Sequence, residues 1–201
     1  MSEVVRFHFD PGCPWAWQSS RWIREVAKVR GVEVEWRLFS LAIVNADKED
    51  PLADAHAKGT AALRSLVLVR REGGNDGVDR VYRAIGERTH ERAEPLEPTV
   101  VGPALEDAGF DPGLLDAALA DDSTMDDVRA EHDSAVAEVG CFGVPTLVVE
   151  SGKGLFGPVI ADAPTGEEAG ELWDHVRWMI EKEGLFELKR ERDRKPGAHQ
   201  D

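Results

Sequence analysis

The sequence contains only two cysteines, Cys13 and Cys141, and they lie far apart in the chain. No C-x-x-C pair is present and the six histidines are scattered, so we expect no metal site. No apolar run approaches the roughly 18 residues of a membrane span, so we expect no membrane partner. Because no basic segment and long apolar stretch open the chain, we expect a cytoplasmic protein. In that reducing compartment the two thiols are expected to be reactive or buried, not a structural disulfide.

Positive charge is also scarce. The chain has 24 Lys and Arg against 39 Asp and Glu, which gives a formal net charge of −15. A field of that sign repels polyphosphates, so we expect no nucleic-acid partner. With 42% hydrophobic and 31% charged residues among 201, the composition is typical of one folded domain, or of one core with a sizeable insertion.

Strand patterns occur at the two ends of the chain. Residues 4–9 and 32–39 have the apolar pattern of strands, and residues 14–30 between them have helical spacing. These residues predict a βαβ unit. Two further short strands, at 145–150 and 154–159, are separated by SGKG, which indicates a hairpin.

Between these patterns, alanine, leucine and charged residues dominate the chain. Glycine and proline divide this stretch into segments with helical periodicity, and another such segment follows the hairpin. The predicted helices are 53–72, 76–92, 98–108, 112–120, 124–139 and 165–184. The order of elements predicts an α/β core, residues 1–50 and 140–185, interrupted by an inserted helical subdomain, residues 51–139. The charged C-terminal tail, residues 186–201, is expected to fray.

The stretch FDPGCPWAW, residues 9–17, places Cys13 where the first strand is followed by the first helix. Unpaired backbone N–H groups and the helix dipole favour negative charge there, so we expect a lowered thiol pKa. Pro14 fits the first helical turn because its missing N–H would be unpaired anyway, and Trp15 would form an aromatic wall beside the sulfur. A cysteine that only packs is the common alternative, but this position favours a nucleophile.

The same turn, together with GVPT at residues 143–146, resembles the DsbA-like family of thioredoxin-fold proteins. Those proteins hold C-P-x-C at the first helix, insert helices into the thioredoxin core and place a cis-proline loop against the active cysteine. The stretches SRWI, EVAKVR, SLAIVN, FGPV, GEEAGELWD and FELKRER are similar to the cytosolic mycothiol-dependent reductases, and they span nearly the whole chain. The resemblance implies a thioredoxin-like α/β fold with a helical insertion.

The resemblance also implies roles for single residues. Cys13 would be the nucleophile and Pro145 the cis-proline, with Val144 presenting its backbone to a substrate or to a thiol cofactor. Without the resemblance we expect this bond to be trans, because only about 5–6% of X–Pro bonds in folded proteins are cis. The side chains that would border the substrate pocket are Trp15, Asn45 and Phe156.

The sequence departs from the family pattern at Ala16, where the resolving cysteine would stand. In a C-x-x-C pair the second thiol releases the mixed disulfide that the first has formed. Three explanations remain open: Ala16 is engineered, a free small thiol resolves the adduct on Cys13, or Cys141 is a displaced resolving thiol. For Cys141, a packed and unreactive thiol is the common alternative.

Three functions are weighed. The favoured one is a thiol-disulfide oxidoreductase or mycothiol-dependent reductase. In it Cys13 attacks a small disulfide or electrophile, and a low-molecular-weight thiol, mycothiol by the resemblance, resolves the adduct. A kappa-class transferase or chromene-carboxylate isomerase would instead activate a bound thiol cofactor, and a redox-disabled module would only bind. Of the other candidates, His8 could polarise the thiol but is expected to be structural, His90 to be solvated, and Asp10 to be a turn residue.

Overall fold

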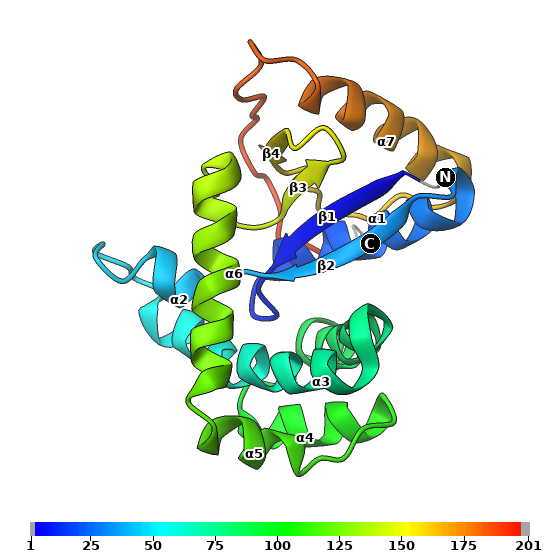
Figure 1. Ribbon diagram of the computed structural model, residues 1–201. Coiled ribbons are helices and arrows are strands. Elements are labelled where there is room, and N and C mark those ends of the chain that lie inside the picture. The colour runs from blue at the N-terminus through cyan, green and yellow to red at the C-terminus, as the bar shows by residue number, and fades with distance from the viewer. Residues whose placement is uncertain (1–2, 198–201) are drawn as a thin grey trace.

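Four strands form one mixed sheet in the order β2-β1-β3-β4. The computed structural model describes residues 3–197. The strand β1 (Val4–Phe9) runs parallel to β2 (Glu33–Leu38) and antiparallel to β3 (Thr146–Val149). The edge strand β4 (Gly154–Phe156) pairs antiparallel with β3. The central strand therefore joins the N-terminal βαβ unit to the C-terminal hairpin (Figure 1).

The helix α1 (Pro14–Arg30) connects the two parallel strands. It ends at Gly31, whose φ of 67° is left-handed, a conformation that glycine adopts without steric cost. The last helix, α7 (Gly166–Ile180), packs against α1. At this contact the buried Trp22 indole donates a hydrogen bond of 3.0 Å to Ala169 O. The helix α1 is therefore held by the sheet and by a second helix.

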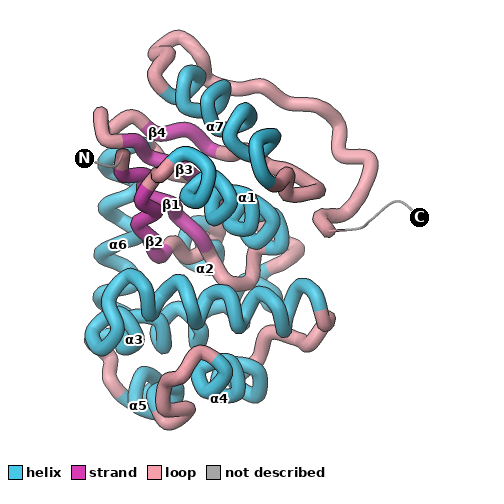
Figure 2. Tube along the Cα trace, turned by 90° about the vertical axis from the view of Figure 1, so that its right-hand side faces the viewer, coloured by secondary structure: helices cyan, strands magenta, loops and turns pink. Residues whose placement is uncertain are grey.

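The remaining helices come between β2 and β3, and Figure 2 shows α3, α4 and α5 gathered on one side of the sheet. They are α2 (Leu41–Val44), α3 (Ala53–Gly86), the π-helix η1 (Glu87–Glu91), α4 (Pro98–Asp107), α5 (Leu114–Ala120) and α6 (Ser123–Val139). Within α3, Gly74 has a φ of 61° and a ψ of −156°, so two helical stretches meet there at a kink.

The α/β architecture with helices inserted between two parts of the sheet is confirmed. The helices predicted at 53–72 and 76–92 are one element with a kink at Gly74, and the π-helix that follows it and α2 were not predicted. The last strand is shorter than predicted and ends at Phe156, because Pro158 has no N–H for the ladder. The boundaries drawn between core and inserted subdomain stay a prediction.

Buried aromatic rings join the sheet to α3. Phe9 of β1 stacks on Tyr82 of α3 with ring centroids 3.9 Å apart, and Trp36 of β2 meets the same tyrosine edge-on at 5.6 Å. Trp17, in the first turns of α1, contacts Tyr82 at 5.8 Å. The Arg24 guanidinium lies 4.4 Å from the Trp36 ring and closes the cluster. This packing fixes the first turn of α1, where Cys13 lies.

Gly86 allows the end of α3 to approach α1. A Cβ atom at this position would lie 2.2 Å from Trp17 Cε3, which real Cβ contacts do not show. Gly86→Ala is therefore expected to lower the free energy of unfolding by about 2 kcal/mol through overpacking, as measured by urea denaturation. The control is Gly184→Ala, whose Cβ would meet no heavy atom within 4 Å. Equal stability of the two variants would contradict this account of the contact.

The C-terminal segment, defined here as residues 186–197, contains no helix or strand. It is nevertheless anchored, because the Gly197 N–H donates a hydrogen bond of 2.8 Å to Ala161 O. That the tail frays stays a prediction, and residues 198–201 lie outside the described residues. Across the described chain, no helix has both the length and the apolar character to cross a bilayer.

Candidate active site

Cys13 is the N-cap residue of α1. Its backbone is extended, with φ −86° and ψ 111°, and its Sγ accepts a hydrogen bond of 3.4 Å from the Ala16 N–H. Its own N–H donates to Asp10 O at 3.0 Å, which closes the turn after β1. The sulfur therefore faces the unpaired N–H groups at the helix N-terminus, as the sequence predicted.

The loop before β3 forms the second wall of the site. Its Val144–Pro145 peptide bond is cis, the isomer that the family resemblance implied and that the residues alone did not. The Cys13 thiol donates a hydrogen bond to Val144 O, with Sγ and O 3.7 Å apart. The Gly157 N–H donates to Pro145 O at 2.8 Å and ties the loop to the end of β4. Segments from opposite ends of the chain thus meet at one sulfur atom.

Trp15 and Asn45, both predicted to border the pocket, have different surroundings. Trp15 is half-buried and follows Cys13 by two residues, and the Cζ atom of Arg192 lies 4.7 Å from its ring centroid. Asn45 caps the end of α2, where its side-chain amide donates a hydrogen bond of 2.9 Å to Leu41 O. The Trp15 ring therefore contacts the C-terminal segment, whereas the Asn45 side chain bonds to Leu41 O and to the Lys48 ammonium.

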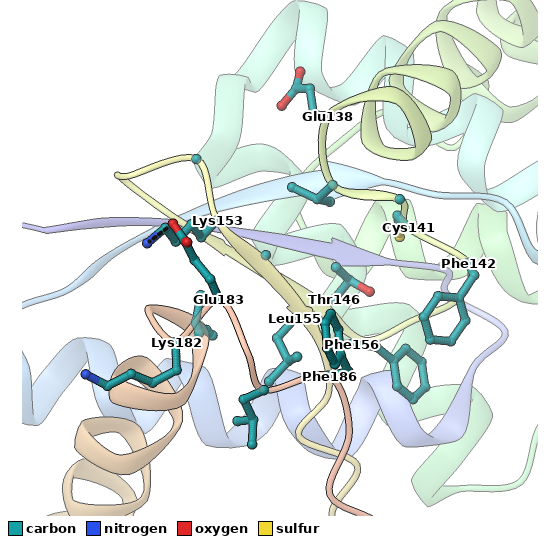
Figure 3. Close-up of a pocket in the computed structure, with 16 residues that line it drawn as sticks. Glu138, Cys141, Phe142, Thr146, Lys153, Leu155, Phe156, Lys182, Glu183 and Phe186 are labelled. Carbon is teal, nitrogen blue, oxygen red and sulfur yellow. Dashed lines mark ion pairs between the residues drawn. The ribbon is translucent and has the colours of Figure 1, made fainter.

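Phe156 and Cys141 share a different pocket, of about 480 Å³, whose lining includes neither Cys13 nor Trp15. Phe156 stacks there on the exposed Phe142, with centroids 5.0 Å apart (Figure 3). The Cys141 thiol donates to Gly143 O at 3.3 Å, and burial raises its pKa. Both thiols are free, and they bond to different carbonyls of one loop.

The model of one protein family matches residues 12–190, a range that includes Cys13, the cis-proline loop and the first five residues of the C-terminal segment. The chain belongs to the Rv2466c-like family. That family is described as mycothiol-dependent nitroreductase Rv2466c. A curated relative, the uncharacterized protein Rv2286c of Mycobacterium tuberculosis (strain ATCC 25618 / H37Rv), is 43% identical over 190 residues. That alignment covers 93% of this chain and 81% of the relative.

Solved structures support the fold of this member of the Rv2466c-like family. One is the probable DsbA oxidoreductase SCO1869 from Streptomyces coelicolor, with a TM-score of 0.59, 21% identity and coverage of 92% of this chain and 94% of that one. Another is the cytosolic disulfide reductase DsbM from Pseudomonas aeruginosa, with a TM-score of 0.58, 14% identity and coverage of 87% and 99%. At these identities the likeness shows the fold, which is the DsbA-like thioredoxin fold with a helical insertion.

Asp10 has a larger part in the site than a turn residue. It is 1% exposed, and its two carboxylate oxygens accept hydrogen bonds of 2.9 Å from the N–H groups of Gly12 and Leu41. Burial raises the pKa of this carboxyl to about 6, against the effect of the two N–H groups. Asp10 therefore joins the cysteine turn to α2 and brings an acidic group to the buried side of the thiol.

The pKa of the Cys13 thiol is shifted upward, whereas the sequence predicted a downward shift. Burial raises the pKa of this thiol to about 11, because the residue is only 8% exposed and the thiolate would lose its hydration. The negative charge of Asp10 acts in the same direction. The N–H groups of Ala16 and Trp15 and the charge of Arg192 favour the thiolate, as a helix N-terminus should, but burial outweighs them. Burial depends on the tertiary structure, so the local sequence did not indicate it.

The raised pKa of Cys13 predicts how the rate of its alkylation depends on pH. Only the thiolate is alkylated, so the rate of Cys13 modification by iodoacetamide should still be rising above about pH 9, beyond the ordinary cysteine pKa of about 8.5. The rate would be followed in a Cys141→Ser background to isolate one thiol. A plateau reached below about pH 8 would contradict the dominance of burial.

Two histidines, His8 and His90, were candidate site residues, and both side chains are largely buried. His90 was expected to be solvated, which is wrong: its Nε2 forms a hydrogen bond of 2.8 Å with Pro11 O, and its ring stacks on Trp17 at 6.3 Å. His8 is 5% exposed, and burial lowers its pKa to about 4, so it is neutral at physiological pH. No group of three or more potential metal-ligating side chains occurs between residues 3 and 197.

Proposed function

We propose that this protein is a cytoplasmic thiol-disulfide exchange enzyme with a single reactive cysteine, and that a low-molecular-weight thiol serves as its co-substrate. Family membership favours mycothiol as that thiol. The observation that supports this proposal most directly is the position of Cys13 Sγ, which lies between the Ala16 N–H and Val144 O. Where a C-x-x-C turn has its second cysteine, this chain has Ala16, which is fully buried. Small disulfides and small electrophiles are the substrate class.

The proposed reaction has two steps. In the first, the Cys13 thiolate attacks a mixed disulfide between the substrate and the small thiol, and the substrate sulfur leaves and takes up a proton. In the second, another molecule of the small thiol, as its thiolate, attacks the adduct, forms the symmetrical small disulfide and releases Cys13 as a thiolate. Overall, the mixed disulfide and one molecule of the free small thiol give the substrate as a thiol and the symmetrical small disulfide, so one disulfide bond is exchanged for another and no further reductant is needed.

The environment of the sulfur suits a long-lived adduct. The mixed disulfide carries no charge at Cys13, so the burial that disfavours the thiolate does not disfavour the adduct. The Ala16 side chain has no thiol to attack it, and Cys141 is held by Gly143 O in another pocket. An external thiol is therefore the proposed route of release, with Val144 and Pro145 lining its approach.

The first experiment is intact mass analysis with peptide mapping after incubation with mycothiol disulfide. We expect one mycothiol on the peptide that contains Cys13, and its removal by excess mycothiol. The Cys141→Ser variant is the matched control and should form the same adduct. A disulfide between Cys13 and Cys141 would make Cys141 the resolving thiol and overturn the single-cysteine mechanism. Absence of any Cys13 adduct would overturn the proposed function itself.

A further inference from the structure

The C-terminal segment crosses the molecule to reach the cysteine turn. Figure 2 shows it leaving the end of α7 and returning along one side of the fold. Two contacts anchor its far end: the Gly197 N–H bonds to Ala161 O at 2.8 Å, and Arg194 pairs with Asp162 at 3.1 Å. Both anchors lie in the loop after β4, which begins at Gly157, where the chain bonds to Pro145 O of the cis-proline loop. The segment therefore has a defined path past the site.

This path places Arg192 on the Trp15 ring. The guanidinium carbon lies 4.7 Å from the ring centroid, within the range of a cation–π contact. In a chain with 39 acidic residues, no carboxylate among residues 3–197 forms an ion pair with Arg192, whereas Arg194 is paired. The charge of Arg192 therefore forms no ion pair among these residues, and it lies on the ring of Trp15, two residues after Cys13.

The charged and titratable groups that interact electrostatically with the Cys13 thiol come from three elements. Asp10, at the end of β1, contributes a carboxyl group, and Tyr82 of α3 contributes a buried phenol whose pKa burial raises. The C-terminal segment contributes Arg192. Within the described chain, Arg192 is thus the cation that acts on the charge of this sulfur.

We propose that Arg192 is a positioning residue of the thiol site: it covers the open face of Trp15 and supplies the positive charge that favours negative charge on Cys13. The inference rests on the proposed function and deepens it. In the mixed disulfide the sulfur is neutral, and negative charge returns to it only as the second thiol attacks and the S–S bond breaks. Arg192 therefore interacts more strongly with the transition state for release than with the adduct.

The test compares Arg192→Gln, Arg192→Lys and Arg190→Gln, all in the Cys141→Ser background. Two rates are measured at neutral pH and low salt: alkylation of Cys13 by iodoacetamide, and release of a Cys13 mixed disulfide by the free thiol. Arg192→Gln should slow both about two- to fivefold, the range for an exposed charge. Arg192→Lys should restore them, and about 0.5 M salt should remove the difference by screening. Arg190→Gln removes the same charge from the same segment and should leave both rates unchanged.

Two results would overturn the inference. One is equal rates for Arg192→Gln and the parent protein at low salt. The other is a Lys variant as slow as the Gln variant, which would assign the effect to packing and not to charge. Alkylation needs no enzymatic turnover, so it tests Arg192 even if mycothiol forms no adduct. Failure of the adduct experiment alone would therefore count against the proposed function and not against Arg192.

Discussion

Ala16→Cys is expected to convert the protein from release by an external thiol to release by its own second thiol. A thiol at position 16 lies three residues from Cys13 on one helix, where side chains are neighbours about 5–6 Å apart. That spacing is compatible with a disulfide, and the Ala16 N–H already bonds to Cys13 Sγ at 3.4 Å. Release then becomes intramolecular, and at millimolar external thiol we expect it to be faster by on the order of a thousandfold.

The measurement is the decay of a purified Cys13 mixed disulfide, followed by intact mass. Ala16→Ser is the matched control, because it has a similar size and no thiol, and it should decay at the wild-type rate. The Ala16→Cys variant should also accumulate an internal disulfide between Cys13 and the introduced thiol. Equal decay of the two variants would show that position 16 does not face the reacting sulfur, and the site geometry would be wrong.

Cys13→Ser is expected to abolish exchange, with a loss of at least about a thousandfold, because a serine hydroxyl is not ionised at neutral pH and forms no disulfide. Cys141→Ser should keep the rate within about twofold, since that thiol lies in a separate pocket. The readout is reduction of a small disulfide by mycothiol. Thermal denaturation of both variants shows whether each is folded.

The activity of Cys13→Ser also distinguishes thiol-disulfide exchange from the alternative transferase or isomerase chemistry. The buried Ala16 suits a transferase or isomerase on the same scaffold, which activates a bound thiol cofactor and needs no resolving cysteine. Such an enzyme would keep its activity when Cys13 is replaced by serine, because the hydroxyl can still donate a hydrogen bond to a bound thiolate. Retained turnover in Cys13→Ser would therefore contradict the nucleophilic role proposed for Cys13.

The features that local sequence predicts are those that depend on neighbouring residues. A cysteine followed by proline between a buried strand and a helical pattern indicated an N-cap thiol, and the structure has it. The strands and most helices followed from periodicity in the same way. The cis bond before Pro145 depends on the packing of distant segments, so only the family resemblance implied it.

The features that the sequence missed depend on tertiary contacts. Arg192 lies far from Cys13 in the chain, and no spacing or motif connects it to Trp15. The raised pKa of Cys13 arises from burial, which the helix-terminus argument does not include. The family resemblance implied Phe156 at the substrate pocket, but its ring stacks on Phe142 and lines a pocket whose lining does not include Cys13.

The most direct test of the single-cysteine mechanism is the rate at which a purified Cys13–mycothiol adduct is released, measured against the concentration of free mycothiol. The mechanism predicts a linear dependence that passes through the origin, because no thiol of the protein resolves the adduct. A finite rate without added thiol that disappears in Cys141→Ser would contradict it, and would show that the protein carries its own resolving cysteine.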